Sequence, residues 1–410
     1  MARRDLRLKY QQQRVRSMSP LSQLHGQIES LLCQQDESGY TDRRHLNVLL
    51  SMVVALLASS AIGLNRWVPF LTTRAKYAAS HQRRLSRWLH NPRINPIKWW
   101  STFTRHWWSE WEAPVIVLAL DSTVLWGRYC LIRLSLPYRG RAVPVTWRVL
   151  RQDTPSVGFA DYRPLLVRLQ HQLPPERSVR LLMDRAFYSQ DLLRQLHQWG
   201  WHYRLRLKGN ARVRGVRGRG QSLKHYAHQL ARGEARYLRA VRLGKSTPSP
   251  TLSIALGRDA VTGHLWAIAS DQPVTLHTFG DYAERFMIEE EFLDEKSNGY
   301  QLESTRLDSA PVLSRLCLVL ALTTWVLVSQ GQQVVERGRR REIDCHWWRG
   351  SSYGRLGWDW IRSVLLRGAT FFATLQLGKP DDPEPAIASL ATARQRSRYG
   401  CSVSSFSFSP

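Results

Sequence analysis

The chain has 410 residues, enough for a large core and for two or three structural units. Its 59 lysines and arginines against 32 acidic residues give a formal net charge of +27 and a pI near 10.7, which indicates a polyanionic partner, nucleic acid before an acidic membrane surface. An apolar fraction of 43% with 17 tryptophans argues against a disordered basic tail, and five scattered cysteines without a CxxC pair argue against a disulfide framework or a structural zinc site and favour a reducing compartment.

The first part of the chain is predicted to be a basic helical module over residues 1–112. Its first 20 residues are basic and glutamine-rich and are expected to form a loose arm without a secretory signal. Apolar periodicity and Asn-Pro boundaries then predict four helices: Leu21–Leu32, His45–Ser59, Arg74–Leu89 and an aromatic helix from Trp99 to Trp108. This pattern favours a DNA-binding element, although no helix-turn-helix signature is clear, and a helical bundle with a charged outer surface fits it equally well.

Two apolar runs are long enough to be checked as membrane spans. Residues 48–64 are at the lower length limit for a span, and residues 316–328 are shorter and follow Arg315 directly. Both contain small or hydroxylated residues, so buried helices of a protein without membrane contact are expected.

The next part is predicted to be an α/β core. Apolar runs predict strands at 114–121, 129–136 and 142–150, then a helix at 160–172, a strand at 179–184, a helix at 189–199 and a strand at 201–208. The order β-β-β-α-β-α-β is that of a ribonuclease-H-like fold, with a mixed sheet flanked by helices. Asp121 and Asp184 close the first and fourth strands, which lie side by side in that fold, and strand ends commonly build sites.

The remaining segments complete the predicted organisation of the chain. Residues 209–278 begin with a glycine-arginine loop and continue with strand-like segments, which indicates a β-rich insertion. A long apolar helix is predicted at 310–336, an amphipathic helix at about 357–374 and a polar, disordered tail at the end. The expected domains are the helical module 1–112, the catalytic core 113–208 and 279–376, the insertion 209–278 and the tail 377–410.

Residues 281–297 carry an unusual inward stripe of polar side chains. Read as one helix at about 100° per residue, Tyr282, Arg285, Glu289 and Lys296 fall within an arc of roughly 60°. Apolar residues share this arc, so we expect it to face the interior. Three other glutamates of the segment are expected on the solvated side: Glu284, Glu291 and Glu295.

Three carboxylates thus become candidate metal ligands: Asp121, Asp184 and Glu289. Glu289 is preferred to its neighbours because it alone shares the arc with Arg285 and Lys296, which would offset phosphate charge. Carboxylate oxygens suit hard divalent cations, and two such ions can promote an in-line phosphoryl displacement. With the basic charge of the chain, the expected phosphodiester is DNA or RNA.

The spacing Tyr282-(2)-Arg285-(3)-Glu289-(6)-Lys296 resembles the Y-R-E-K signature of bacterial insertion-sequence transposases of the insertion-sequence-four family. The segments Leu-Ala-Leu-Asp121-Ser-Thr and Leu-Met-Asp184-Arg-Ala-Phe-Tyr are similar to its first two motifs, although the second departs from the commoner Asp-Arg-Gly-Tyr. The resemblance spans residues 114–375.

This resemblance implies a DDE transposase that binds terminal inverted repeats, cuts the DNA ends and joins the 3'-OH ends to target DNA. Two Mg²⁺ or Mn²⁺ ions would bind Asp121, Asp184 and Glu289. Tyr282, Arg285 and Lys296 would hold phosphates of the transposon end. Trp266 would stand where the family places a tryptophan that stacks on a flipped base, although a core role for it is equally expected. A homodimer on DNA and a bacterial cytoplasmic, nucleoid-associated location follow from the same resemblance.

Two other classes of protein fit the same residues. One is another metal-dependent nuclease with a ribonuclease-H-like core, which would cut DNA without joining it. The other is a catalytically inactive DNA-binding protein, in which the carboxylates only form salt bridges with Arg285 and Lys296.

Overall fold

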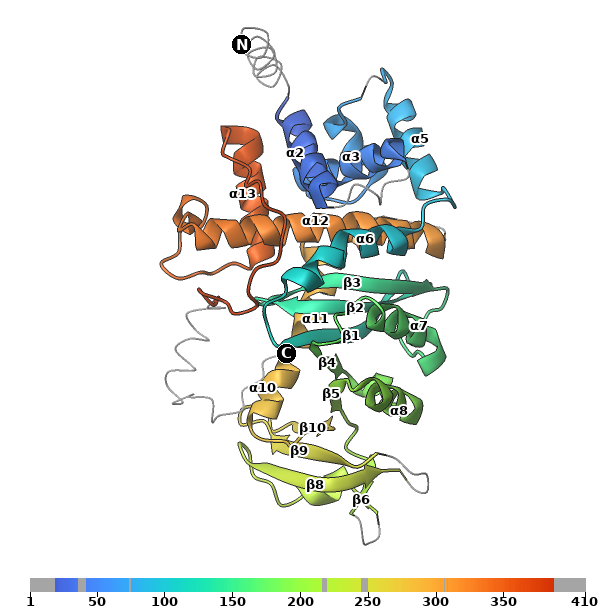
Figure 1. The fold of residues 1–410 in the computed structure, drawn as a ribbon, viewed down its shortest axis with the longest axis vertical. Helices are drawn as coiled ribbons and strands as arrows, with labels where there is room; N and C mark the ends of the chain where they lie inside the picture. The colour runs from blue at the N-terminus through green and yellow to red at the C-terminus, as the bar shows by residue number, and fades with distance from the viewer. Residues whose placement is uncertain are drawn as a thin grey trace. The chain divides into compact units, whose positions relative to one another are not determined.

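The structure is a computed structural model that describes residues 19–35, 42–73, 75–215, 220–244, 250–305, 307 and 309–386. Contacts divide the chain into a helical unit, residues 1–111 with 293–378, and a sheet unit, residues 112–292 with 379–410 (Figure 1). The predicted N-terminal arm up to residue 18, residues 216–219 of the glycine-arginine loop and the tail after residue 386 lie outside the described residues. The helical unit therefore includes residues 293–376, which the sequence predicts to be part of the catalytic core.

The sheet unit contains the ribonuclease-H-like order that the sequence predicts. Its first five strands lie in the order β3-β2-β1-β4-β5, with antiparallel β1–β2 and β2–β3 pairs and parallel β1–β4 and β4–β5 pairs. The parallel strands are apolar runs covered on both faces, as parallel sheets require. The strands are β1 (Val115–Leu125), β2 (Tyr129–Tyr138), β3 (Arg141–Leu150), β4 (Ser178–Met183) and β5 (His202–Arg206).

Helices cover both faces of this core sheet. Helix α7 (Phe159–Gln170) lies on the face of Thr146 and Arg148, because the Arg148 Nη1 donates to the Asp161 carbonyl at 2.5 Å. Helix α8 (Gln190–Trp199), after the short η2 (Arg185–Phe187), packs beside α7. The opposite face of the sheet, where Arg133 points, is covered by α11 (Phe286–Leu293), whose Glu291 binds that arginine at 2.7 Å. Side chains alternate between the faces along a strand, so these contacts fix the layer order.

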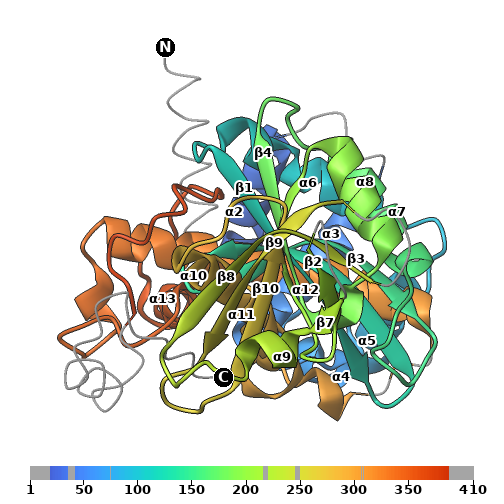
Figure 2. The same ribbon diagram turned by 90° about the horizontal axis from the view of Figure 1, so that it is seen from below.

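The predicted β-rich insertion continues the core sheet instead of forming a separate one. Strand β10 pairs antiparallel with β5, and the sheet extends to ten strands in the order β3-β2-β1-β4-β5-β10-β9-β8-β6-β7 (Figure 2). The added elements are β6 (Arg212–Arg214), β7 (Gln221–Ser222), α9 (Leu223–Ala227), β8 (Ala235–Leu243), β9 (Leu252–Arg258) and β10 (Leu265–Ser270), and α10 (His277–Ala283) leads back to α11.

The helical unit is built around α12 (Ala310–Glu336), which packs on α13 (Tyr353–Arg367), α3 (Arg43–Ser59) and α6 (Pro96–Glu110). A Cβ added to Gly357 would lie 1.8 Å from the Leu327 carbonyl oxygen, so glycine is required where α12 and α13 cross. The remaining elements are α2 (Pro20–Gln35), α4 (Leu64–Trp67), η1 (Val68–Phe70), α5 (Ala78–Leu89), η3 (Asp294–Asn298), η4 (Leu302–Ser304) and η5 (Arg340–Glu342).

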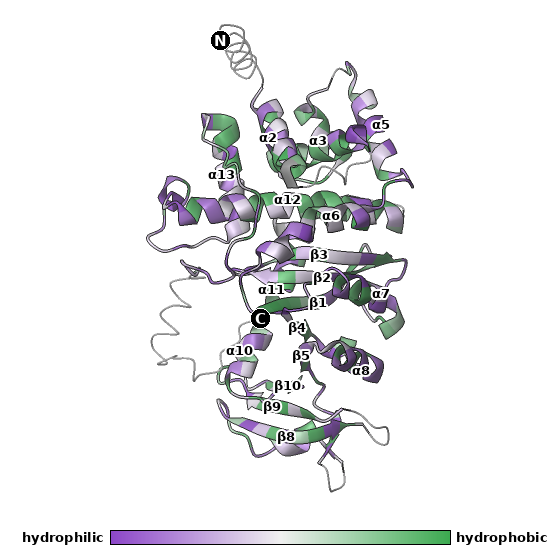
Figure 3. Cartoon of the chain, viewed as in Figure 1, coloured by the Kyte–Doolittle hydropathy of each residue, from purple (hydrophilic) through white to green (hydrophobic). Residues whose placement is uncertain are grey.

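Helix α12 is long and apolar enough to cross a membrane, and 89% of its most apolar window is buried inside the protein (Figure 3). Trp325 on α12 packs edge to face against Trp100 and Trp107 of α6, with ring centroids 6.1 and 5.2 Å apart. The helix is therefore buried, as predicted. The bent pair α3 with α4 and η1 passes the same length test if it is counted as one span.

Candidate active site

The two aspartates lie level with each other in adjacent parallel strands. Leu120 of β1 pairs with Met183 of β4, so Asp121 and Asp184 are the next residues of the two strands at the same height. One detail differs from the sequence prediction: β1 runs on to Leu125, so Asp121 lies inside the strand and not at its end. The reason is that β2 continues to pair with β1 beyond the point where β4 stops.

Asp121 lies in a mostly buried position, with 16% of its side chain exposed. Burial raises the pKa of Asp121 to about 6, against the opposing effects of Arg285 and of the hydrogen bond from the Ser122 amide. The charges of Glu289 and Asp184 raise the pKa further. The charges of both other predicted carboxylates therefore act on Asp121, although the three residues come from β1, the end of β4 and α11.

The polar segment 281–297 is not one helix. Helix α10 ends at Ala283 and α11 begins at Phe286. At the junction the Arg285 amide bonds to the Tyr282 carbonyl and the Ile288 amide to the Arg285 carbonyl. These are i to i−3 bonds, whose winding advances each residue by about 120° and so rotates everything after the junction relative to a regular helix.

That rotation makes the predictions for two glutamates after the junction wrong. Glu291 and Glu295 are predicted to be solvated, but they are 3% and 2% exposed, and Glu291 binds the fully buried Arg133. Glu284, which precedes the junction and is also predicted to be solvated, is half-buried, and burial raises its pKa to about 7.

Arg285 joins two of the predicted metal ligands. Its guanidinium is almost fully buried and donates to Asp121 Oδ2 at 2.9 Å and to Glu289 Oε1. Glu289 is predicted to face the interior, but its side chain is 47% exposed, so this carboxylate lies at the open edge of the group. The structure thus brings Asp121, Arg285 and Glu289 into direct contact, with Asp184 beside them in the sheet.

Tyr282 and Trp266 lie behind Arg285 in the core. The Tyr282 hydroxyl accepts a hydrogen bond from Arg285 Nε at 2.9 Å, and the tyrosine is fully buried. Trp266, 6% exposed, packs against Tyr282 with ring centroids 6.0 Å apart, and the Arg206 guanidinium covers its ring at 4.1 Å. Base stacking would need an open ring face, so this packing favours the core role of Trp266. The DNA-contact roles of both residues stay predictions.

Lys296 belongs to the other compact unit. It lies in the π-helical turn η3, and its Nζ is 3.7 Å from Glu303 Oε1. Its expected role in holding phosphate stays a prediction.

Sequence reasoning missed the buried Arg133–Glu291 pair, which anchors α11 to the sheet. The phenylalanine next to Glu291 also contacts this arginine, with the Arg133 guanidinium 5.3 Å from the centroid of the Phe292 ring. A signal existed: Arg133 is a charged residue in the middle of the fully buried strand Tyr-Cys-Leu-Ile-Arg-Leu-Ser-Leu. A buried charge needs a partner, and only an acidic residue of another element could supply one.

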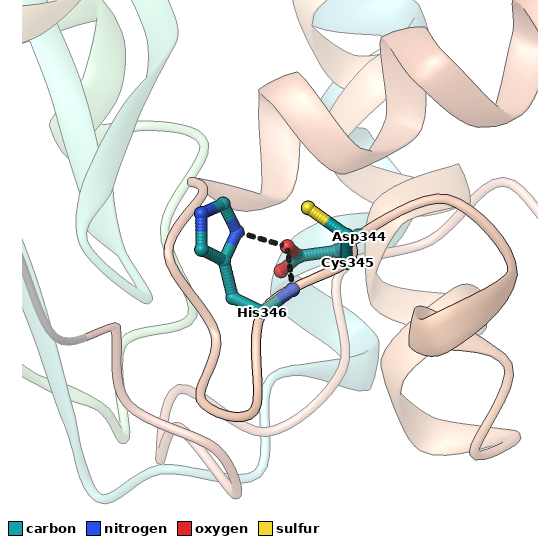
Figure 4. Close-up of side chains that lie close together, drawn as sticks. All are labelled: Asp344, Cys345 and His346. Carbon is teal, nitrogen blue, oxygen red and sulfur yellow. Dashed lines mark hydrogen bonds and ion pairs between the residues drawn. The ribbon is translucent and has the colours of Figure 1, made fainter.

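Among the described residues, one group of three potential metal ligands has all its ligand atoms within 4.8 Å of one another: Asp344, Cys345 and His346 (Figure 4). Asp344 is already engaged, because its Oδ1 lies 2.6 Å from His346 Nδ1 and its Oδ2 accepts from Arg340 at 3.1 Å. Arg340 also donates to the carbonyls of His346 and Trp347. These hydrogen bonds stabilise the loop after η5. The cluster does not include the predicted metal ligands.

One comparison with known proteins bears on the class of protein to which this chain is similar. Residues 160–326 match the family model of the transposase DDE domain, which includes Asp184 and Glu289 but begins after Asp121. The match covers less than half of the chain and supports a DDE transposase. No curated protein sequence matches the chain. Among solved structures, the chain is similar to the cryo-EM structure of the piggyBac transposase synaptic complex with hairpin DNA. The sequence identity is 11% and the TM-score is 0.42, and the alignment covers 85% of this chain and 78% of that one.

Proposed function

We propose that this chain is a DNA transposase of the insertion-sequence-four type, which binds the terminal inverted repeats of its element, cuts the DNA ends and joins the 3'-OH ends to target DNA. The observation that carries the proposal is the group Asp121, Asp184 and Glu289, which lies where β4 ends beside β1 in a ribonuclease-H-like core. The match of residues 160–326 to the transposase DDE domain supports it.

The residues of this group fit divalent metal ions. They supply carboxylate oxygens, the ligands that Mg²⁺ and Mn²⁺ prefer. The position between Asp121 and Glu289 already accommodates a cation, because the Arg285 guanidinium lies there. Asp121, Asp184 and Glu289 would hold two Mg²⁺ or Mn²⁺ ions, which activate the attacking oxygen and stabilise the leaving one in phosphoryl transfer.

The residues around the carboxylates would position the DNA. With Asp121 and Glu289 as metal ligands, Arg285 would be able to offer its forked guanidinium to a phosphate. Tyr282 holds Arg285 in place through its hydroxyl, and Lys296 would add a second positive charge. Trp266 would reach a flipped base only after Arg206 moves off its ring.

The wider assignments belong to the same proposal. The basic helical residues 1–112 would bind the transposon ends, residues 113–208 and 279–376 would form the catalytic part, and 209–278 the insertion. A homodimer would pair two ends on DNA, in the cytoplasm of a bacterium and close to its nucleoid.

The test compares the wild-type protein with Glu289→Gln on duplex DNA that carries the repeats flanking its gene. We expect the variant to bind this DNA with wild-type affinity, because Glu289 lies in the proposed metal site and gives no DNA contact. Cleavage in Mg²⁺ should fall by at least about 1000-fold, as for loss of a group that acts on the transition state. Wild-type cleavage by Glu289→Gln would refute the proposed site. Binding without cleavage by the wild-type protein would identify an inactive DNA-binding protein.

A further inference from the structure

Helix α5 (Ala78–Leu89) has one buried face and one open basic face. Leu85 and Trp88 are buried, together with His81 and Leu89. At about 100° per residue, Arg83 lies opposite the centre of this buried face and Arg87 about 145° from it, whereas Gln82 lies at the border of the buried face, about 75° from its centre. Arg83, Arg87 and Gln82 are exposed. The open face of α5 carries small and polar side chains and no large apolar one.

The outward face is held in a fixed orientation by α3 and the segment before α5. The Trp88 Nε1 donates to the His45 carbonyl at 2.9 Å, and the Arg84 Nη2 donates to Asn47 Oδ1 at 2.9 Å. The Thr73 hydroxyl lies 3.0 Å from His81 Nδ1. These contacts use the inner and lateral side chains and leave Arg83 and Arg87 exposed.

The open face of α5 is positively charged, and the neighbouring sequence contains no acidic residue that could neutralise it. No aspartate or glutamate occurs between Asp42 and Glu110. Within the part of the chain that the structure describes, neither Arg83 nor Arg87 has an ion-pair partner. Both line a surface hollow of about 560 Å³ together with Leu64, Ser80, Gln82 and Ser86.

We propose that α5 is the helix that reads base sequence in the major groove of duplex DNA. Arg83 and Gln82 contact base edges, and Arg87 and Lys76, an exposed residue two positions before the helix, contact phosphates. This inference rests on the proposed function, to which it adds the element that recognises the transposon ends. Arginine pairs with guanine and glutamine with adenine through two hydrogen bonds each.

Two further observations favour duplex DNA as the occupant. The first turn of α5 consists of Ala78, Ala79 and Ser80, all exposed, so its backbone can approach a groove closely. Recognition helices commonly contact bases through their N-terminal half, where Gln82 and Arg83 lie. A-form RNA has a major groove too narrow for a helix, and a membrane would require large apolar side chains on the open face.

The test selects bound duplexes from a random-sequence library with the full-length protein. Arg83→Ala and Gln82→Ala are compared with the wild type and with Arg105→Ala, which removes an exposed arginine of the neighbouring helix α6. Thermal unfolding confirms that each variant is folded. We expect Arg83→Ala and Gln82→Ala each to lose about ten-fold or more of the preference at one base position. Arg105→Ala should keep the motif and weaken binding to all sequences alike.

The outcomes separate this inference from the proposed function. If both α5 variants select the wild-type motif and lose no more affinity than Arg105→Ala, α5 does not read bases, although end recognition by another element stands. If the wild-type protein enriches no motif at all, the reading role of α5 and specific end binding both fail.

Discussion

At the scale of single residues, Arg285 holds the candidate site together. It is 3% exposed and contacts both Asp121 and Glu289. Burial disfavours the charge of Arg285, but Tyr282 and the two carboxylates outweigh it and raise the pKa of Arg285 above its ordinary value. A permanently charged side chain thus neutralises carboxylates that would otherwise repel each other.

Replacing this arginine should destabilise the protein without metal. Arg285→Met leaves Asp121 buried without its counter-charge, and because Glu289 is half exposed we expect a loss of about 2–3 kcal/mol in the free energy of unfolding, below the range for fully buried pairs. Mn²⁺ should raise the unfolding temperature of Arg285→Met more than that of the wild type, since a cation then replaces the guanidinium. Arg141→Met, at a surface pair with Glu290, is the control. An equal Mn²⁺ shift in all three proteins would contradict this role.

Glu284 gives a prediction about pH. Burial, with the nearby charge of Asp281, raises the pKa of Glu284 to about 7 from an ordinary value near 4.5. The folded state therefore binds this proton more tightly than the unfolded state, and the stabilisation is complete below about pH 4.5 and lost as the pH rises through 7. Glu284→Gln removes the charge, so its stability relative to the wild type should grow between pH 5 and pH 8, by about 1–3 kcal/mol. Chemical denaturation at the two pH values measures this, and a difference that stays constant with pH would refute it.

At the scale of elements, the strands were predictable and the critical helix was only partly so. Apolar runs marked β1, β4 and β5 because parallel strands are buried on both faces, and they also located Asp121 and Asp184. The i to i−3 bonds at Arg285 were not predictable, because they depend on how α10 and α11 pack against the sheet. A regular helix therefore predicts the buried positions of Arg285 and Tyr282 correctly, but it places Glu289 in the interior and Glu291 in solvent, the reverse of what the structure has.

The Arg133–Glu291 pair should fix the position of α11, and with it that of Glu289. Glu291→Gln removes the carboxylate charge that faces the buried Arg133, and we expect a loss of about 3–5 kcal/mol in the free energy of unfolding. The matched change Glu290→Gln, at a carboxylate that is 47% exposed, should cost less than about 1 kcal/mol. Urea denaturation of both variants measures the difference. Equal losses would show that the buried pair does not anchor the helix.

At the scale of the whole molecule, the basic stretch without acidic residues and the candidate carboxylates belong to different units. The stretch between Asp42 and Glu110 contains no acidic residue and belongs to the helical unit. The candidate carboxylates Asp121, Asp184 and Glu289 all belong to the sheet unit. This division suits a protein in which one unit attracts DNA phosphates and the other holds metal ions for the reaction. Composition predicted the polyanionic partner, but it could not show that Lys296 belongs to the helical unit.

The proposed transposase joins DNA as well as cutting it. The most direct measurement incubates the purified protein with Mg²⁺, a labelled pre-cut end bearing the repeat that flanks its gene, and a supercoiled plasmid. We predict that label appears covalently in plasmid DNA with the wild-type protein, and does not with Asp121→Asn or Asp184→Asn, although both variants still bind the end. If the wild-type protein cleaves the repeat but transfers no label, it does not join DNA and is a nuclease instead of a transposase.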